Sequence, residues 1–221
     1  MPISYHRFAG TNLDRLAALS DGVFAVAMTL LVLDLKAPVL PKRSQHPIWS
    51  GHGGGSEHAL VNDLLHHLAP HLLPYVMSFL TLGIFWVGQQ TQLESFMRST
   101  RALTWINLTF LLAVTLLPFS TALLAQDTTY RIAMAVYWLN LFALGAVLFI
   151  SLAYADRAGL LSAETTAEMR AALKRRIVVY QCLYASAALT CLINTYLAIG
   201  LLIVFQLNAV IAPRIWILDR A

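Results

Sequence analysis

The apolar residues of this chain gather in long runs that short polar stretches separate. A helix crossing the hydrocarbon core of a bilayer needs roughly 20 predominantly apolar residues. The last two runs form one apolar block that is too long for a single crossing, so we expect a turn at Asn194 and Thr195. The pattern therefore predicts an all-α membrane protein in one domain, residues 1–221, with six transmembrane helices over residues 16–35, 74–92, 102–124, 131–154, 177–193 and 196–212.

The polar stretches between the runs carry signals of their own. Prolines and a glycine run mark residues 37–60 as an outer connector. Leucines at helical spacing over 61–75 predict an interfacial segment, and Pro74 is expected to start the second span. Before the fifth span, Ser162 or Thr165 followed by acidic residues predicts a capped, short cytoplasmic helix.

Composition supports a membrane protein and excludes a soluble domain. Hydrophobic residues make up 58% of the chain, charged residues 12%, and the mean hydropathy is +0.67. A soluble domain of this length needs more charge to cover its surface. The first apolar run is longer than a signal-peptide core, and no A-x-A-like cleavage site follows it. We expect it to be retained.

The basic residues predict the orientation of the chain. With the N-terminus inside, 11 of the 15 lysine and arginine residues lie in inner segments. Short cytoplasmic loops carry such an excess, so both termini are expected to be cytoplasmic. The net charge of +4 and the pI near 9.3 thus reflect topology. No basic stripe indicates a nucleic-acid partner.

Histidines are the main candidates for metal chemistry or catalysis, and six of them crowd the outer side. His67 and His71 have the four-residue spacing of metal ligands, but Pro70 lies between them and no cysteine or carboxylate cluster completes a site. Polar interfacial side chains explain them better, although a role in pH modulation stays open. No H-E-x-x-H, no G-x-S-x-G and no phosphate-binding glycine loop is present, so we predict neither an enzyme nor a metal or cofactor site. The six are His46, His52, His58, His66, His67 and His71.

The first predicted helix has two unlike faces. At 100° per residue, Leu19, Gly22, Leu30 and Leu33 fall within 40° of Val26. Ser20 and Asp21 point away from this stripe. Lipid offers polar groups no partners, so the polar face must meet protein, and Arg15 could supply a charge partner. Periodicity alone indicates ordinary packing or lipid contact for the aliphatic stripe.

Three segments together resemble one known family. Arg15, Leu19, Ser20 and Asp21 resemble the R-x-x-x-F-S-D signature in the first helix of the transmembrane protein 175 family, the lysosomal potassium channels. The resemblance runs in order along nearly the whole chain. Its further carriers are Tyr75, Ser78, Phe79 and Trp86 in the second span and Trp105, Asn107, Leu108, Phe110, Pro118, Phe119 and Thr121 in the third.

Two positions depart from the pattern of that family. Leu19 replaces the signature phenylalanine, which keeps bulk and loses an aromatic contact. Gln89 or Gln90 stands where the family usually has a histidine. A glutamine can still form hydrogen bonds with the first helix, but it cannot titrate, which puts proton sensing at this position in doubt.

The resemblance implies a homotetramer in a bacterial cytoplasmic membrane, with four first helices lining a central potassium path. Under this mapping, Val26, Leu30 and Leu33 form narrowing rings that gate the pore by excluding water. Thr29 would tune cation choice near the constriction, and Asp34 would form a negative ring at the outer mouth. Arg15 would pair with Asp21 of a neighbouring subunit or lie at the inner mouth. The residues implied to hold the first helix in place by hydrogen bonds are Ser20, Asp21, Trp86, Gln89 and Asn107.

The sequence contains no T-V-G-Y-G filter. The resemblance therefore implies a potassium-permeable, cation-selective channel whose selectivity comes from side chains, with no cofactor besides the permeant ion. A secondary or proton-coupled cation transporter is the alternative, although no pair of broken helices supports it. A metal- or haem-dependent membrane enzyme that uses the outer histidines is the third hypothesis.

Overall fold

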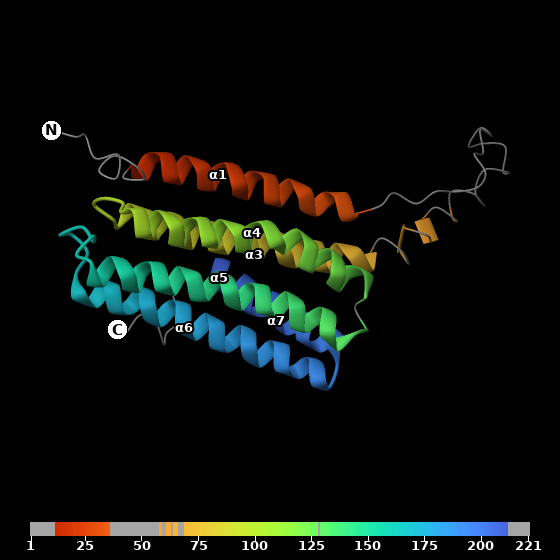
Figure 1. Cartoon of the computed structure of the whole chain (residues 1–221). Coiled ribbons are helices and arrows are strands. Elements are labelled where there is room, and N and C mark those ends of the chain that lie inside the picture. Colours follow the sequence, from red (N-terminus) through yellow and green to blue (C-terminus); the bar gives the residue numbers. More distant parts are fainter. Residues whose placement is uncertain are drawn as a thin grey trace.

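Six long helices form the protein in the computed structural model, which describes residues 12–35, 58, 61–62, 64–65, 69–127 and 129–211. Short 3-10 turns extend two of the helices. This confirms the all-helical prediction for the described residues (Figure 1). The elements are α1 (Leu13–Leu30), η2 (Leu31–Asp34), α3 (Ala69–Glu94), α4 (Arg101–Gln126), α5 (Arg131–Arg157), α6 (Ala167–Leu189), η5 (Thr190–Leu192) and α7 (Thr195–Ile211).

Four of these helices are long and apolar enough to cross a membrane, namely α1 with η2, α3, α4 and α5. Helix α7 is even more apolar than these four but has only 17 residues. Helix α6 begins in the charged stretch before its predicted span and continues into it without a break. Helices α6 and α7 follow one another as a helical hairpin with its turn at residues 193–194, and Thr195, which was predicted to lie in the turn, is the first residue of α7.

Local capping signals explain most of the helix starts. The Asn12 side chain accepts a hydrogen bond from the Arg15 amide, and the Asn194 side chain accepts one from the Tyr196 amide. Helix α6 is capped by Thr166, not by Ser162 or Thr165 as predicted. Because Thr166 caps a helix that runs on to Leu189, the predicted short cytoplasmic helix is the first part of α6.

The position of Pro74 differs from the prediction. Helix α3 begins at Ala69, so Pro74 lies inside the helix and does not start it. Because Pro74 is the sixth residue of α3, its ring removes the backbone hydrogen bond that position 74 would otherwise donate to the carbonyl of residue 70. The predicted connector 37–60 lies outside the described residues except for residue 58, and the interfacial segment 61–75 is described only in part.

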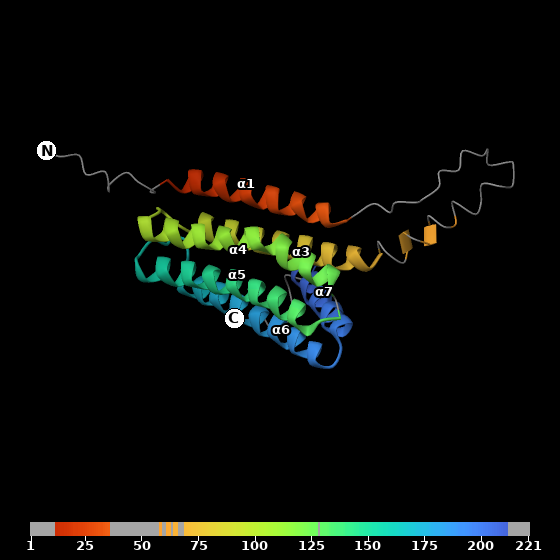
Figure 2. The same cartoon turned by 45° about the vertical axis from the view of Figure 1, so that its right-hand side comes forward.

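The helices run side by side in layers (Figures 1 and 2). Helix α1 lies at one edge and packs on α3 and α4. Helices α5 and α7 lie on the other side of the α3–α4 pair, and α6 is farthest from α1, packed on α5 and α7. Because α1 contacts the rest of the chain on one side only, most of its circumference is left uncovered.

A buried polar network ties four helices together. The Tyr137 hydroxyl lies 3.0 Å from Thr81 Oγ1 and accepts a hydrogen bond from Ser78 Oγ at 3.3 Å. Thr121 Oγ1 donates to Ser78 Oγ at 2.6 Å, and Gln206 Nε2 donates to Thr81 Oγ1 at 2.7 Å. All five side chains are buried. The network therefore joins α3, α4, α5 and α7 in a setting where unpaired polar groups are costly.

One end of the bundle is closed by two paired loops. The Met97 amide donates to the Leu160 carbonyl, and the Ser162 amide donates to the Ser95 carbonyl, both at 2.8 Å. Gly159 has φ of +62° and makes the turn after α5. A second apolar cluster packs beneath these loops and includes Leu16 of α1 with Leu93, Phe96, Leu103, Leu152, Ala155 and Leu160.

We expect Tyr137→Phe to lower the free energy of unfolding by about 1 kcal/mol, because it removes a hydroxyl that links α5 to α3 and keeps the ring shape. Thermal unfolding in detergent measures the change. Tyr130→Phe is the matched control, since the Tyr130 side chain is 63% exposed. Equal midpoints for wild type and Tyr137→Phe would show that the network contributes nothing to stability.

Candidate functional site

The candidate site is built on α1, because the buried side of this helix is fixed by contacts with α3 and α4. Leu16, Ser20, Phe24 and Ala27 are its buried residues, and their spacing places them on one face. The Phe24 ring lies 6.0 Å from the Phe110 ring, centroid to centroid. This face therefore has the packing of an ordinary helix–helix contact with a polar residue in its middle.

The opposite face of α1 is aliphatic and uncovered. Val26 is 58% exposed and Leu33 is 70% exposed, and Leu19 and Leu30 are also exposed. The predicted constriction residues Val26, Leu30 and Leu33 thus share one face of the helix. Nothing in the described part of the chain buries this face. The Thr29 hydroxyl, also exposed, donates to the Val26 carbonyl at 2.8 Å.

Ser20, Gln89 and Asn107 form a closed triangle between α1, α3 and α4. Gln89 Nε2 donates to Ser20 Oγ at 3.0 Å and to Asn107 Oδ1 at 2.7 Å. Asn107 Nδ2 donates to Ser20 Oγ at 3.3 Å. Ser20 Oγ in turn donates to the Leu16 carbonyl at 2.9 Å, so this hydroxyl uses its donor and both lone pairs.

Asp21 makes a second contact with α3 beside this triangle. Its Oδ1 accepts hydrogen bonds from Trp86 Nε1 at 2.8 Å and from Gln90 Nε2 at 2.5 Å. These contacts lie toward the surface, since Asp21 and Trp86 are exposed. The carboxylate thus meets two donors of α3, as a charged group in an apolar layer requires.

The structure joins five of the predicted site residues by side-chain hydrogen bonds between helices. Ser20, Gln89 and Asn107 meet in the triangle, and Asp21 meets Trp86. The Arg15 side chain is exposed near the start of α1, away from that cluster. Asp34 is the last residue of η2, and its side chain lies outside the described residues.

Sequence reasoning missed part of this site. Gln90 binds Asp21, while its neighbour Gln89 binds Ser20. Both glutamines therefore contact α1, whereas the sequence predicted this contact for only one of the two. Consecutive residues on a helix are 100° apart, which lets each reach a different residue of α1. The signal that could have found both is the paired order of Ser20-Asp21 and Gln89-Gln90.

The described residues contain no candidate metal site that would support the hypothesis of a metal-dependent enzyme. No three histidine, cysteine, aspartate or glutamate side chains gather there around a common point. His58 and His71 belong to this part of the chain, whereas His46, His52, His66 and His67 lie outside it. Of the His67–His71 pair, only His71 therefore lies within the described residues.

Comparison with known proteins identifies relatives over the same helices. The sequence model of the family described as "Endosomal/lysosomal potassium channel TMEM175" matches residues 15–118. A protein of Streptomyces collinus named as a potassium channel is 39% identical over 134 residues. A protein of Chamaesiphon minutus with the same kind of name is 38% identical over 126 residues. The matches cover 59% and 56% of this chain and only 58% and 56% of the two relatives.

A solved structure extends the similarity over nearly all of the fold. The crystal structure of a lysosomal potassium-selective channel TMEM175 homologue from Chamaesiphon minutus superposes with a TM-score of 0.71 and 27% sequence identity. The superposition covers 90% of this chain and 96% of that one. The relatives reported are named as channels, not as enzymes.

A double-mutant cycle on Trp86→Phe and Asp21→Ala should give a coupling free energy of about 1 kcal/mol, because the indole N–H donates to the carboxylate. Unfolding of the wild type, both single variants and the double variant in detergent provides the four values. Replacing Trp105 by Phe is the control, since Trp105 is 60% exposed on α4 and should show no coupling to Asp21. A coupling of zero for Trp86 would contradict the anchoring of α1 at this point.

Proposed function

Because this chain belongs to the TMEM175 family, we propose that it is a potassium-permeable, cation-selective channel. The observation that carries the proposal is the division of α1 into an anchored polar side and an uncovered aliphatic side. The named relatives and the solved structure support a channel, and the family model matches residues 15–118, which include most of α1, all of α3 and most of α4.

The pore we propose lies between four copies of the chain. One α1 cannot enclose a path, but four copies around a cyclic axis can place four aliphatic faces toward the centre. Val26, Leu30 and Leu33 would then form rings along the axis. This arrangement would cover side chains that a single chain leaves open, and it keeps the Ser20 side against α3 and α4 of the same chain.

The proposed gate works by excluding water. An aliphatic ring offers a cation no ligand in place of its hydration shell, so a narrow ring of Val26 or Leu30 side chains raises the barrier to its passage. The triangle of Ser20, Gln89 and Asn107 would hold the ring residues at a fixed distance from the axis. Selectivity then arises from side chains of α1 and not from a carbonyl filter.

Two polar residues would act beside the rings. Thr29 lies on the exposed side of α1, three residues from Val26, where its oxygen can meet a cation next to the constriction. Asp34 ends η2 and would place a ring of negative charge at the outer mouth, which concentrates cations there. The excess of basic residues in the inner segments supports cytoplasmic termini and insertion in a cytoplasmic membrane.

Current across a planar bilayer with opposed potassium and sodium gradients is the first test. We expect discrete currents that reverse toward the potassium equilibrium potential. Silence in the bilayer together with saturable uptake of tracer into vesicles would instead indicate a secondary or proton-coupled transporter, and the proposed pore would have to be abandoned.

Val26→Asn should increase the basal current roughly tenfold, which corresponds to a barrier lowered by about 1.4 kcal/mol, and should reduce the preference for potassium. An amide side chain lets water into the ring. Val32→Asn is the matched control, because Val32 is 48% exposed but lies about 120° away from Val26 around the helix. Wild-type current in Val26→Asn would refute the gate at this position.

A further inference from the structure

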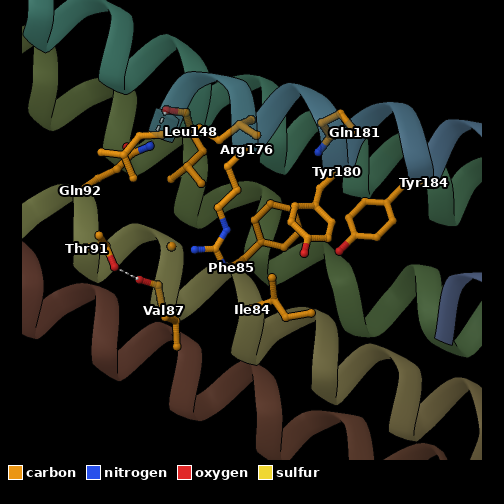
Figure 3. A pocket seen from close by; sticks show the side chains of 13 residues that line it. Ile84, Phe85, Val87, Thr91, Gln92, Leu148, Arg176, Tyr180, Gln181 and Tyr184 are labelled. Atoms are coloured by element: carbon orange, nitrogen blue, oxygen red, sulfur yellow. Dashed lines mark hydrogen bonds between the residues drawn. The ribbon is translucent and has the colours of Figure 1, made fainter. Parts of the chain in front are cut away.

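A groove between α6 and α3 has no role in the proposed pore. Helix α5 lies behind this groove, which has a volume of about 90 Å³ (Figure 3). Val87, Thr91 and Arg176 on its rim are exposed. Its floor is buried and consists of Phe85, Gln92, Leu148 and Tyr184.

One face of α6 points three polar side chains into this groove. Arg176, Tyr180 and Tyr184 are four residues apart, so they lie above one another along the helix. Figure 3 shows all three side chains directed from α6 toward α3. The stripe runs about 12 Å along the helix axis, with the charge at one end and two phenols beyond it.

Arg176 has no acidic partner within the described part of the chain. Asp156, the acidic residue paired with α6, is held by Arg170 at 2.8 Å and by Lys174 at 2.5 Å. The Arg176 guanidinium instead lies 6.0 Å from the centre of the Tyr180 ring. A charge at the edge of the hydrocarbon layer without a counter-ion is costly, and here it borders an apolar groove.

The position of the groove selects the anion that could pair with this charge. Arg176 immediately precedes the predicted span 177–193, which places it at the predicted inner surface of the membrane. The groove continues from there past Ile177, Phe85 and Leu148, so a ligand must have an anionic end at the surface and an apolar remainder.

We propose that this groove binds an anionic phospholipid. The phosphate pairs with the guanidinium of Arg176, whose planar fork suits two phosphate oxygens. The phenol hydroxyls of Tyr180 and Tyr184 can donate to oxygens of the glycerol esters, and one acyl chain lies along Phe85 and Leu148. The ligand links α6 to α3 across a gap that protein side chains leave open.

The test is native mass spectrometry of the purified protein with dioleoylphosphatidylglycerol or dioleoylphosphatidylcholine, which differ in head group and share their acyl chains. The wild type should retain more of the anionic lipid. Arg176→Gln should lower this retention roughly fivefold, the effect of one basic residue on binding to an anionic lipid surface. Arg98→Gln removes an equal charge from an exposed loop residue and should leave retention unchanged.

A second variant separates the groove from surface charge. Val87→Phe fills the rim with an apolar side chain and keeps Arg176, so it should reduce retention of both lipids. Equal retention in Arg176→Gln and wild type, or equal losses in Arg98→Gln and Arg176→Gln, would overturn the proposal. The proposal would also be overturned if inorganic phosphate alone displaced the bound lipid. It would be overturned too if the wild-type protein retained neither lipid and the Val87→Phe variant differed from it in oligomeric state. Currents are not measured here, so failure of this proposal leaves the channel proposal standing.

Discussion

The exclusion of water from the hydrocarbon layer is the constraint on which this structure depends. A polar side chain inside that layer must find its partner in the protein, and Ser20 does so completely. Its hydroxyl donates within α1 and accepts from Gln89 and Asn107, which come from two other helices. This requirement fixes which side of α1 faces the bundle, and the aliphatic side is left outward as a consequence. The proposed pore face is therefore the side of α1 that remains exposed after Ser20 has found its partners in α3 and α4.

Two polar networks join different sets of helices, one around Tyr137 and one around Ser20. The network around Tyr137 joins four helices through side chains that are all buried, so α3, α4, α5 and α7 hold one another. Helix α1 joins this group through the triangle of Ser20 and the contacts of Asp21, and on one side only. Interactions of this kind contribute modestly each. Apolar packing adds to the polar contacts of α1, since Phe24 and Ala27 belong to the main hydrophobic core together with Tyr137.

Helix α6 lies at the opposite edge, where its charged beginning is held by a different means. Arg170 and Lys174 converge on Asp156 at the end of α5, and the loops at this end pair through backbone hydrogen bonds. Gln181 Nε2 donates to the Leu141 carbonyl farther along. These contacts attach α6 to α5 but leave the side toward α3 open. The groove exists because α6 packs on α5 and α7 and faces α3 across a gap.

The sequence by itself determined most of the helices, because apolar runs of membrane length are local signals. It also indicated that Ser20 and Asp21 need protein partners, and the resemblance pointed to Trp86, Asn107 and a glutamine. Only the tertiary structure decided that Gln89 and Gln90 both reach α1, that α6 is continuous from Ala167, and that Tyr137 sits at the centre of a polar network. Those outcomes depend on which helices become neighbours and in what rotation, and hydrogen bonds between residues far apart in the chain exist only after that packing is made.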